Sequence, residues 1–379
     1  MCGIYLTYFN GLSVKKCTQE EVIFNKINIL LKKKNFKQIY QISNNYKSDA
    51  NFLNYFKFRN ERILISKIVK KIQKEKEFQN KNSYLLDACW NLSTELVRRY
   101  NFVKSHIRFV SDENVVFYKL LHNTVNSINY QEIRGRDSLG IVVNFFIKYD
   151  YAIWSFLKKN TLYKKNYIIK KNKKYINFVI IVKTFNIYGS LGDNSKNILK
   201  QISKNKYLNF VLSSCKINKF FILAHTRWAS VGKIDNKNTH PIFIQNSSRQ
   251  NRVFAMMNGS IQNYRSFVKE KKNDSDTFAI PNLLKQNHLV KNVNLLKKKL
   301  NLLKGIFSII FFFEEDPTQI FVFKKNNQGL YLGKNKERLV IASDKYALVE
   351  ETNFMANINN NSLLHFDFFR ENVNYSIVK

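Results

Sequence analysis

MCGIYLTYF, residues 1–9, predicts a β-strand that begins at the chain terminus, because its residues are mostly apolar or aromatic. If Met1 is removed, Cys2 becomes the terminal residue and carries a thiol and a free α-amine together. An α-amine has a pKa of about 7.7–8.0, so it can act as a base near neutral pH while the thiol attacks a substrate. Gly3 leaves no side chain beside the sulfur. Alone, the stretch is a weak signal, since many chains begin with Met-Cys by chance.

A second polar cluster, HTRWAS at 225–230, directly follows an apolar stretch that predicts a strand at 220–225. Arg227 offers a fork of N–H donors that suits a carboxylate. An Arg–Asp pair within the protein explains this arginine equally well when the cluster is considered alone.

Two more clusters allow a structural and a functional interpretation. Asn258-Gly259 follows a strand predicted at 252–257, and it is either a hairpin turn or a pair of N–H donors for an oxyanion. Asp276 lies in SDT, residues 275–277, ahead of an apolar helical stretch. This segment is either a helix N-cap or the source of a carboxylate for a substrate ammonium.

Taken together and in this order, the clusters are far more specific. The motifs are MCGI at the terminus, RGRDS (134–138), HTRWAS (225–230), NTHP (238–241), Asn-Gly (258–259) and SDT (275–277). They resemble the class II glutamine amidotransferases, and in particular the glutaminase domain of the glucosamine–fructose-6-phosphate aminotransferases. GLYLG at 329–333 and IASD at 341–344 resemble the closing strands of that domain.

The resemblance implies a role for each matching residue. Cys2 is implied as the nucleophile that forms a γ-glutamyl thioester from glutamine and releases ammonia. The Asn258 side chain and the Gly259 N–H are implied as the oxyanion hole. Arg227 is implied as the group that holds the α-carboxylate of glutamine, and Asp276 as the acceptor for its α-ammonium.

The chain also departs from the family pattern. Trp228 stands where the family has a residue near the exit of the ammonia path, but Ser230-Val231 replaces the usual Thr-His that follows Trp-Ala. Ser230 keeps a hydroxyl, whereas Val231 offers only its backbone N–H. Met257 replaces the histidine that commonly precedes Asn-Gly. These differences leave the nucleophile, the oxyanion donors and the two charged groups in place.

The resemblance implies an N-terminal-nucleophile (Ntn) hydrolase fold of the α+β class. This is a four-layer αββα sandwich with two antiparallel sheets, here with a helical insertion. One amidotransferase domain is expected over 1–379, with the helical insertion at about 18–105 and a Lys-rich insertion at about 150–215. Strands are predicted at 140–147, 177–182, 220–225, 252–257, 307–313, 319–323 and 338–343.

The helical segment carries its own apolar stripes. Ile65, Ile68, Val69 and Ile72 are spaced as on one helix face, and a second stripe of the same kind runs from 85 to 96. We therefore expect this segment to fold as an appendage, and any exposed apolar side of it to contact a partner. The lysine-rich run at 158–174 is expected to be a solvated excursion.

Composition excludes several other classes of protein. The 379 residues (45.0 kDa) include 63 basic and 27 acidic residues, a net charge of +36, but lysine far outnumbers arginine, and arginine is the usual sequence-specific reader of nucleic acid. We therefore expect no dedicated nucleic-acid partner. No apolar run approaches the ~20 residues of a membrane span, and no signal peptide is evident, so the expected address is cytoplasmic. The cysteines and histidines form no ligand pattern, so no metal site and no cofactor are expected.

The expected activity is hydrolysis of L-glutamine to glutamate and ammonia. The sugar-phosphate isomerase domains of the aminotransferases have no counterpart in the sequence. The ammonia acceptor is therefore expected on a separate sugar-phosphate isomerase-type protein, unless the chain is a fragment or simply hydrolyses glutamine. A catalytically degenerate scaffold or regulatory subunit is the alternative. A nucleic-acid-binding protein is supported by charge alone.

Overall fold

The computed structural model describes residues 2–11, 20–132, 135–162, 164–186, 189–244, 252–268, 274–285, 289–334, 338–348, 352, 354–368 and 374–378. The chain divides into two compact units. The sheet unit comprises Met1–Asn10 and Asn123–Lys379, and the helical unit comprises Gly11–His122.

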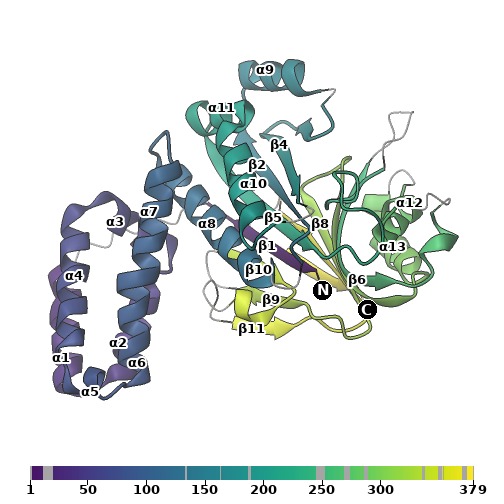
Figure 1. Ribbon diagram of the computed structural model, residues 1–379. Coiled ribbons are helices and arrows are strands. Elements are labelled where there is room, and N and C mark those ends of the chain that lie inside the picture. The colour runs from purple at the N-terminus through teal and green to yellow at the C-terminus, as the bar shows by residue number, and fades with distance from the viewer. Residues whose placement is uncertain are drawn as a thin grey trace. The chain divides into compact units, whose positions relative to one another are not determined.

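The sheet unit is built on two β-sheets (Figure 1). In spatial order, sheet A contains β11 (Phe354–Asn357), β9 (Tyr331–Lys334), β10 (Arg338–Ala342), β1 (Gly3–Phe9), β5 (Ile217–Arg227), β2 (Ser138–Lys148), β4 (Tyr175–Phe185) and β3 (Tyr167–Lys171). Sheet B contains β13 (Asn374–Val378), β12 (Ser362–Asp367), β8 (Gln319–Lys325), β7 (Gly305–Phe313) and β6 (Val253–Ile261). Every strand pair in the described residues is antiparallel.

Helices and short helical turns complete this unit. They are α9 (Tyr151–Thr161), α10 (Asp193–Lys204), α11 (Lys206–Ser214), α12 (Ala279–Leu283) and α13 (Val293–Leu300), with 3₁₀ turns η2 (Tyr264–Ser266), η3 (Asp276–Phe278), η4 (Leu289–Lys291) and η5 (Lys345–Ala347). Helix α8 (Asp112–Glu132) contains the boundary between the units. None of the helices in the described ranges combines the length and the apolar character that a bilayer span requires.

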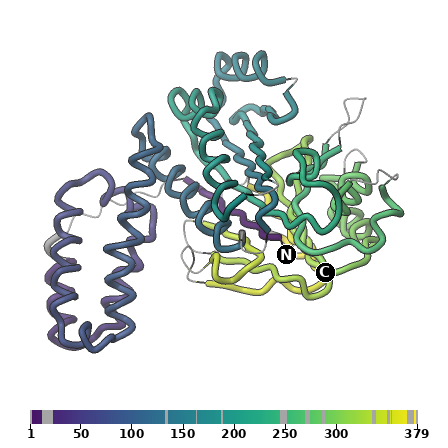
Figure 2. Tube along the Cα trace, in the orientation of Figure 1, coloured from purple at the N-terminus to yellow at the C-terminus, as the bar shows by residue number. Residues whose placement is uncertain are grey.

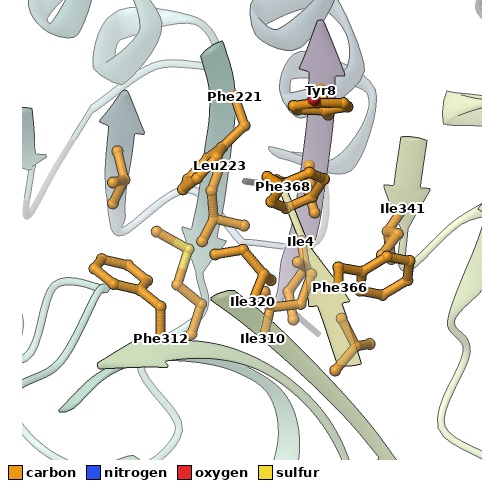
Figure 3. Packing of buried hydrophobic residues seen from close by; sticks show 14 of the residues in the cluster. Ile4, Tyr8, Phe221, Leu223, Ile310, Phe312, Ile320, Ile341, Phe366 and Phe368 are labelled. Carbon is orange, nitrogen blue, oxygen red and sulfur yellow. The ribbon is translucent and has the colours of Figure 1, made fainter. Parts of the chain in front are cut away.

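The main core lies between the two sheets. Tyr8 and Leu223 of sheet A pack in one cluster with Ile310 and Phe312 of sheet B (Figure 3). A second cluster joins the opposite face of sheet B to α12 and α13, and α10 packs against β2 and β4 on sheet A. The order helix, sheet, sheet, helix confirms the predicted four-layer α+β sandwich with two antiparallel sheets.

Strand β1 runs through the middle of sheet A between β10 and β5 (Figure 2). All seven of its residues are buried. A strand covered on both faces needs no alternation of polar and apolar residues, which accounts for the continuous apolar run after Cys2. The residue before this strand is therefore fixed at one end of the sheet.

The helical unit contains α1 (Glu20–Lys32), α2 (Phe36–Asn45), α3 (Asp49–Lys57), α4 (Arg59–Gln73), α5 (Lys76–Gln79), α6 (Ser83–Trp90), a π-helical turn η1 (Asn91–Glu95) and α7 (Leu96–His106). The predicted stripe Ile65, Ile68, Val69 and Ile72 is buried on α4, so it forms the core of this unit and not a docking surface. Helices continue to residue 132, beyond the expected end at 105. That the segment is an insertion in an amidotransferase domain stays a proposal.

The structure differs from the sequence analysis at two strands. β6 continues to Ile261, so Asn258-Gly259 lies inside a strand paired with β7 and is not a hairpin turn. The run 158–174 is not a loose excursion, because it contributes the end of α9 and all of edge strand β3, and Ile168 of β3 is buried in the core between the sheets. Most of its lysines are exposed, so their side chains are solvated while the backbone is part of the sheet.

Candidate functional site

Three neighbouring strands of sheet A bring the first two motifs together. Gly3 of β1 pairs with Thr226 of β5, and Arg227 pairs with Ser138 of β2. Cys2 therefore lies beside the end of β5, where its Sγ accepts a hydrogen bond from the backbone N–H of Trp228 at 3.3 Å. The register alone accounts for this contact between residues that are 226 positions apart.

A small polar network fixes the start of β1. The Ile4 N–H donates to Ser343 Oγ at 3.0 Å, and Ser343 Oγ donates to Gln131 Oε1 at 2.8 Å. A Cβ on residue 3 would lie 2.3 Å from Gln131 Oε1. Gly3 is thus required by the close approach of Gln131, and the network holds the backbone that carries Cys2.

The environment of Cys2 opposes ionisation of its thiol. Burial raises the pKa of Cys2, while the hydrogen bond from Trp228 and the positive charge of Arg227 act in the opposite direction. The thiolate is the nucleophilic form of cysteine. Chemistry at Cys2 therefore requires a base that takes the thiol proton during attack.

Arg227 is buried, and burial lowers its pKa while the charges of Cys2 and Asp276 favour its protonated form. Its Nη1 donates to the carbonyl of Lys233 at 3.0 Å, and its Nη2 donates to the carbonyl of Val231. Two of its five N–H donors thus hold the loop after β5. The remaining donors can bind an anion.

Asp276 supplies a buried carboxylate on the opposite side of the site. Its Oδ2 accepts from the Ile261 N–H at 2.9 Å, and its Oδ1 accepts from Ser275 Oγ at 3.2 Å. Burial raises its pKa, whereas these donors and Arg227 stabilise the ionised form. Ser275 is the N-cap of η3, as the structural interpretation of this segment predicts, and the role of the neighbouring Asp276 as an acceptor for an ammonium stays a prediction.

Asn258 and Gly259, the predicted oxyanion donors, lie on β6 of sheet B. Asn258 is buried and its Oδ1 has no hydrogen-bond partner among the described residues. Gly259 has φ of 110°, and a Cβ there would lie 2.1 Å from the carbonyl oxygen of Ile306. Only glycine fits this position, and a buried amide with an unused oxygen is a group that native structures rarely leave uncompensated.

The loop after β5 is anchored on the RGRDS motif. Asp137 Oδ2 accepts from the Ala229 N–H at 2.7 Å, and the Asp137 N–H donates to the carbonyl of Arg227. Trp228 and Ser230 are exposed, and Val231 is half-buried and uses its carbonyl oxygen instead of its N–H. Arg134 of the motif, like Met1, lies outside the described residues.

A pair of buried histidines connects the two sides of the site. His225 Nε2 lies 2.7 Å from the carbonyl of Met257, His240 Nδ1 lies 2.7 Å from His225 Nδ1, and Thr277 Oγ1 lies 3.1 Å from His240 Nε2. Burial lowers the pKa of His225 to about 3 and that of His240 well below its ordinary value. With both rings neutral, every contact is satisfied if Thr277 donates to His240, His240 to His225, and His225 to Met257.

This chain of hydrogen bonds links residues adjacent to Asp276 and to Asn258. Sequence reasoning placed both histidines in motifs, HTRWAS and NTHP, but assigned them no role, because burial and pairing cannot be seen in a single sequence. Asp137, within RGRDS, and Gln131, outside the motifs, were likewise given no role. The predicted residues Cys2, Arg227 and Asp276 are close enough that their charges affect one another's pKa values.

Known proteins share this sequence pattern. Residues 213–376 match the family described as glutamine amidotransferase domain. The chain is 31% identical over 175 residues to the glutamine–fructose-6-phosphate aminotransferase (isomerizing) of Helicobacter pylori, covering 41% of this chain and 26% of that one. It is 34% identical over 138 residues to the enzyme of the same name from Listeria innocua, covering 34% and 22%.

A solved structure of an allosteric regulatory enzyme of purine biosynthesis matches 68% of this chain and 46% of its own, with 16% identity and a TM-score of 0.42, which is too low to support a conclusion. The chain resembles the class II glutamine amidotransferases, as its motifs predict, and it spans about a quarter of the length of the curated relatives it matches.

Proposed function

We propose that this chain, which resembles the class II glutamine amidotransferases, hydrolyses L-glutamine to glutamate and ammonia through a thioester on Cys2. One observation carries the proposal: Cys2, the buried cation of Arg227 and the buried carboxylate of Asp276 lie close enough together for their charges to affect the pKa values within the group. A zwitterionic amino acid with a side-chain amide needs a charge of opposite sign at each end and a nucleophile at the amide.

The first step is attack on the amide. After removal of Met1, the α-amine of Cys2 takes the thiol proton, and Sγ forms a bond to the amide carbon of glutamine. The negative charge that develops on the amide oxygen is stabilised by the side chain of Asn258 and the N–H of Gly259. The raised pKa of the Cys2 thiol supports this order, because a buried thiol needs a base at the moment of attack.

The second step expels ammonia. The tetrahedral intermediate collapses, its C–N bond breaks, and the proton held by the α-amine passes to the leaving nitrogen. Water then attacks the thioester, the same amine acts as base, and glutamate leaves as Cys2 regains its proton. Arg227 binds the α-carboxylate and Asp276 the α-ammonium throughout, and Ser230, Val231 and Trp228 belong to the loop at the site.

The ammonia acceptor is a sugar phosphate bound by a sugar-phosphate isomerase-type domain or protein, in keeping with the names of the relatives. The test is addition of a sugar-phosphate isomerase-type protein together with fructose 6-phosphate: amino-sugar formation from glutamine supports this acceptor, and ammonia release without amino sugar contradicts it.

Glutamate formation tests the glutaminase itself. Cys2→Ala should abolish it, whereas Cys215→Ala, which alters a free and half-buried cysteine outside the site, should leave it intact. Asn258→Ala should lower turnover by roughly 10²–10³-fold while KM changes little. Mass spectrometry of the purified chain should show that Met1 is absent.

Substantial ammonia release by Cys2→Ala would contradict the proposal. So would an unprocessed Met1 in a preparation without glutaminase activity, which would favour the catalytically degenerate scaffold. If the Asn258→Ala variant lost thermal stability but kept its turnover, the oxyanion role of Asn258 would be contradicted. The thioester on Cys2 would be unaffected by that result.

A further inference from the structure

One cavity in the described part of the chain lies away from Cys2. It has a volume of about 830 Å³ and lies in the sheet unit, between the start of β3, the end of β4, the loop after β5 and the segment around η3. Arg227, Asn258 and Asp276 do not line it. The volume falls within the range of about 300–1,000 Å³ that is typical of small-molecule sites.

The cavity is lined by an excess of positive charge. Lys165, Lys183, Lys237, Arg265 and Lys285 contribute cations, and Asp274 is the one carboxylate among its described lining residues. Asp274 forms an ion pair with Lys237, whose ammonium also lies 5.0 Å from the centre of the Phe278 ring. The one acidic residue among the described lining residues is therefore already paired with Lys237.

The environment of Lys183 distinguishes this cavity from an ordinary surface patch of lysines. It lies on β4, is only partly exposed, and has no ion pair or side-chain hydrogen bond in the described part of the chain. Its ammonium faces the ring of Phe243 at 5.0 Å. Burial lowers the pKa of Lys183 to about 7, against a smaller opposing effect of Asp235. A partly buried cation without a counter-ion costs free energy unless a ligand supplies one.

Apolar walls accompany these charges. Phe243, Phe267 and Phe278 line the cavity together with the amides of Asn236 and Asn282. Lysine binds phosphate as a point charge, and aromatic and amide groups bind the organic part of a small ligand. The lining thus combines the two kinds of contact that a phosphorylated organic molecule uses.

We propose that this cavity binds a phosphorylated small molecule, with its phosphate next to Lys183 and its organic part against the phenylalanine walls. The site is distinct from the glutamine site and does not depend on glutaminase activity. The two lie on either side of η3, since Asp276 faces the glutamine site and Phe278 lines the cavity.

Isothermal titration calorimetry with inorganic pyrophosphate on the full chain, at constant ionic strength, tests the proposal. We expect saturable binding at one site. Lys183→Gln should weaken it by about tenfold or more, as expected for loss of a charge-assisted contact. Lys200→Gln removes the same charge from an exposed position on α10 and should leave the affinity unchanged. Malonate, a dianion without phosphorus, should bind more weakly than pyrophosphate.

Two further results would overturn the proposal. If pyrophosphate does not saturate, or if Lys183→Gln and Lys200→Gln have equal effects, the interaction comes from the diffuse charge of the chain. If malonate binds as tightly as pyrophosphate, the ligand class is wrong. Should Lys183→Gln fail to fold, Lys285→Gln at the exposed rim gives the same comparison, with a smaller expected loss.

Discussion

At the scale of single residues, burial sets the charge of His225 and His240. Burial lowers the pKa of His225 to about 3 and that of His240 well below its ordinary value, whereas each imidazole titrates near 6.5 in an unfolded chain. Below pH 6.5 the unfolded state therefore binds more protons than the folded state. The free energy of unfolding then falls as the pH falls, by about 1.4 kcal/mol per pH unit for each such proton.

We predict that His240→Gln reduces this slope, because it removes one buried group that stays neutral only in the folded chain. The measurement is urea unfolding at several pH values between 7 and 5, with His106→Gln as the control, since His106 lies in the helical unit and outside the pair. An unchanged slope in His240→Gln would mean that the pair is not held neutral.

Lys183 gives a second prediction from the same rule, in a higher pH window. Burial lowers its pKa to about 7, against about 10.4 in an unfolded chain, so the unfolded state binds more protons between these values and stability rises with pH across that window. Lys183→Met should stabilise the chain at pH 7 by roughly 1–3 kcal/mol and flatten this rise. Thermal unfolding at pH 7 and 9, compared with Lys200→Met, measures both effects; a lower midpoint for Lys183→Met would contradict it.

The sequence proposes site residues only where their chemistry is visible in a motif. Cys2, Arg227 and Asp276 could be named because a terminal thiol, an arginine after a strand and an acid before a helix each suit one part of an amino-acid substrate. His225, Gln131 and Lys183 could not. Their importance depends on burial and on partners that are distant in sequence, and a single sequence contains neither.

At the scale of elements, strand pairing decides what local pattern leaves open. Asn-Gly is the strongest short signal for a hairpin turn, yet Asn258 pairs with Ser308 and Gly259 with Phe307 inside sheet B. The positive φ of Gly259 serves a close approach to β7 and not a reversal of the chain. The alternation of residues in β6 indicates a strand but does not determine where it ends.

The lysine-rich run provides a prediction at the same scale. Ile168 of β3 is buried between the sheets, whereas Ile169 on the other face of the strand is half-buried. Ile168→Ala should lower the free energy of unfolding by about 2–5 kcal/mol, and Ile169→Ala by clearly less. Urea unfolding of the two variants makes the comparison. Losses that are both small would mean that β3 does not contribute to the core.

At the scale of the whole molecule, the charge of +36 is the feature most open to misreading. A buried ion pair shows that some of it is structural: in the helical unit, Lys119 donates to Asp49 at 2.9 Å and to the carbonyls of Lys47 and Ser48. Most lysines in the described ranges are instead exposed. Exposed lysines attract any polyanion without specificity, and salt screens this attraction.

We therefore predict weak nucleic-acid binding that disappears at about 0.15 M salt and shows no sequence preference, because it depends on counter-ion release alone. Fluorescence anisotropy with a labelled duplex and a labelled single strand against rising salt is the measurement. Affinity that persists at this salt concentration with a clear sequence preference would contradict the prediction. Lys183→Gln distinguishes the field from the cavity: it should leave the nucleic-acid signal unchanged, since one charge in a large excess contributes little, while pyrophosphate binding falls because the affected contact is local.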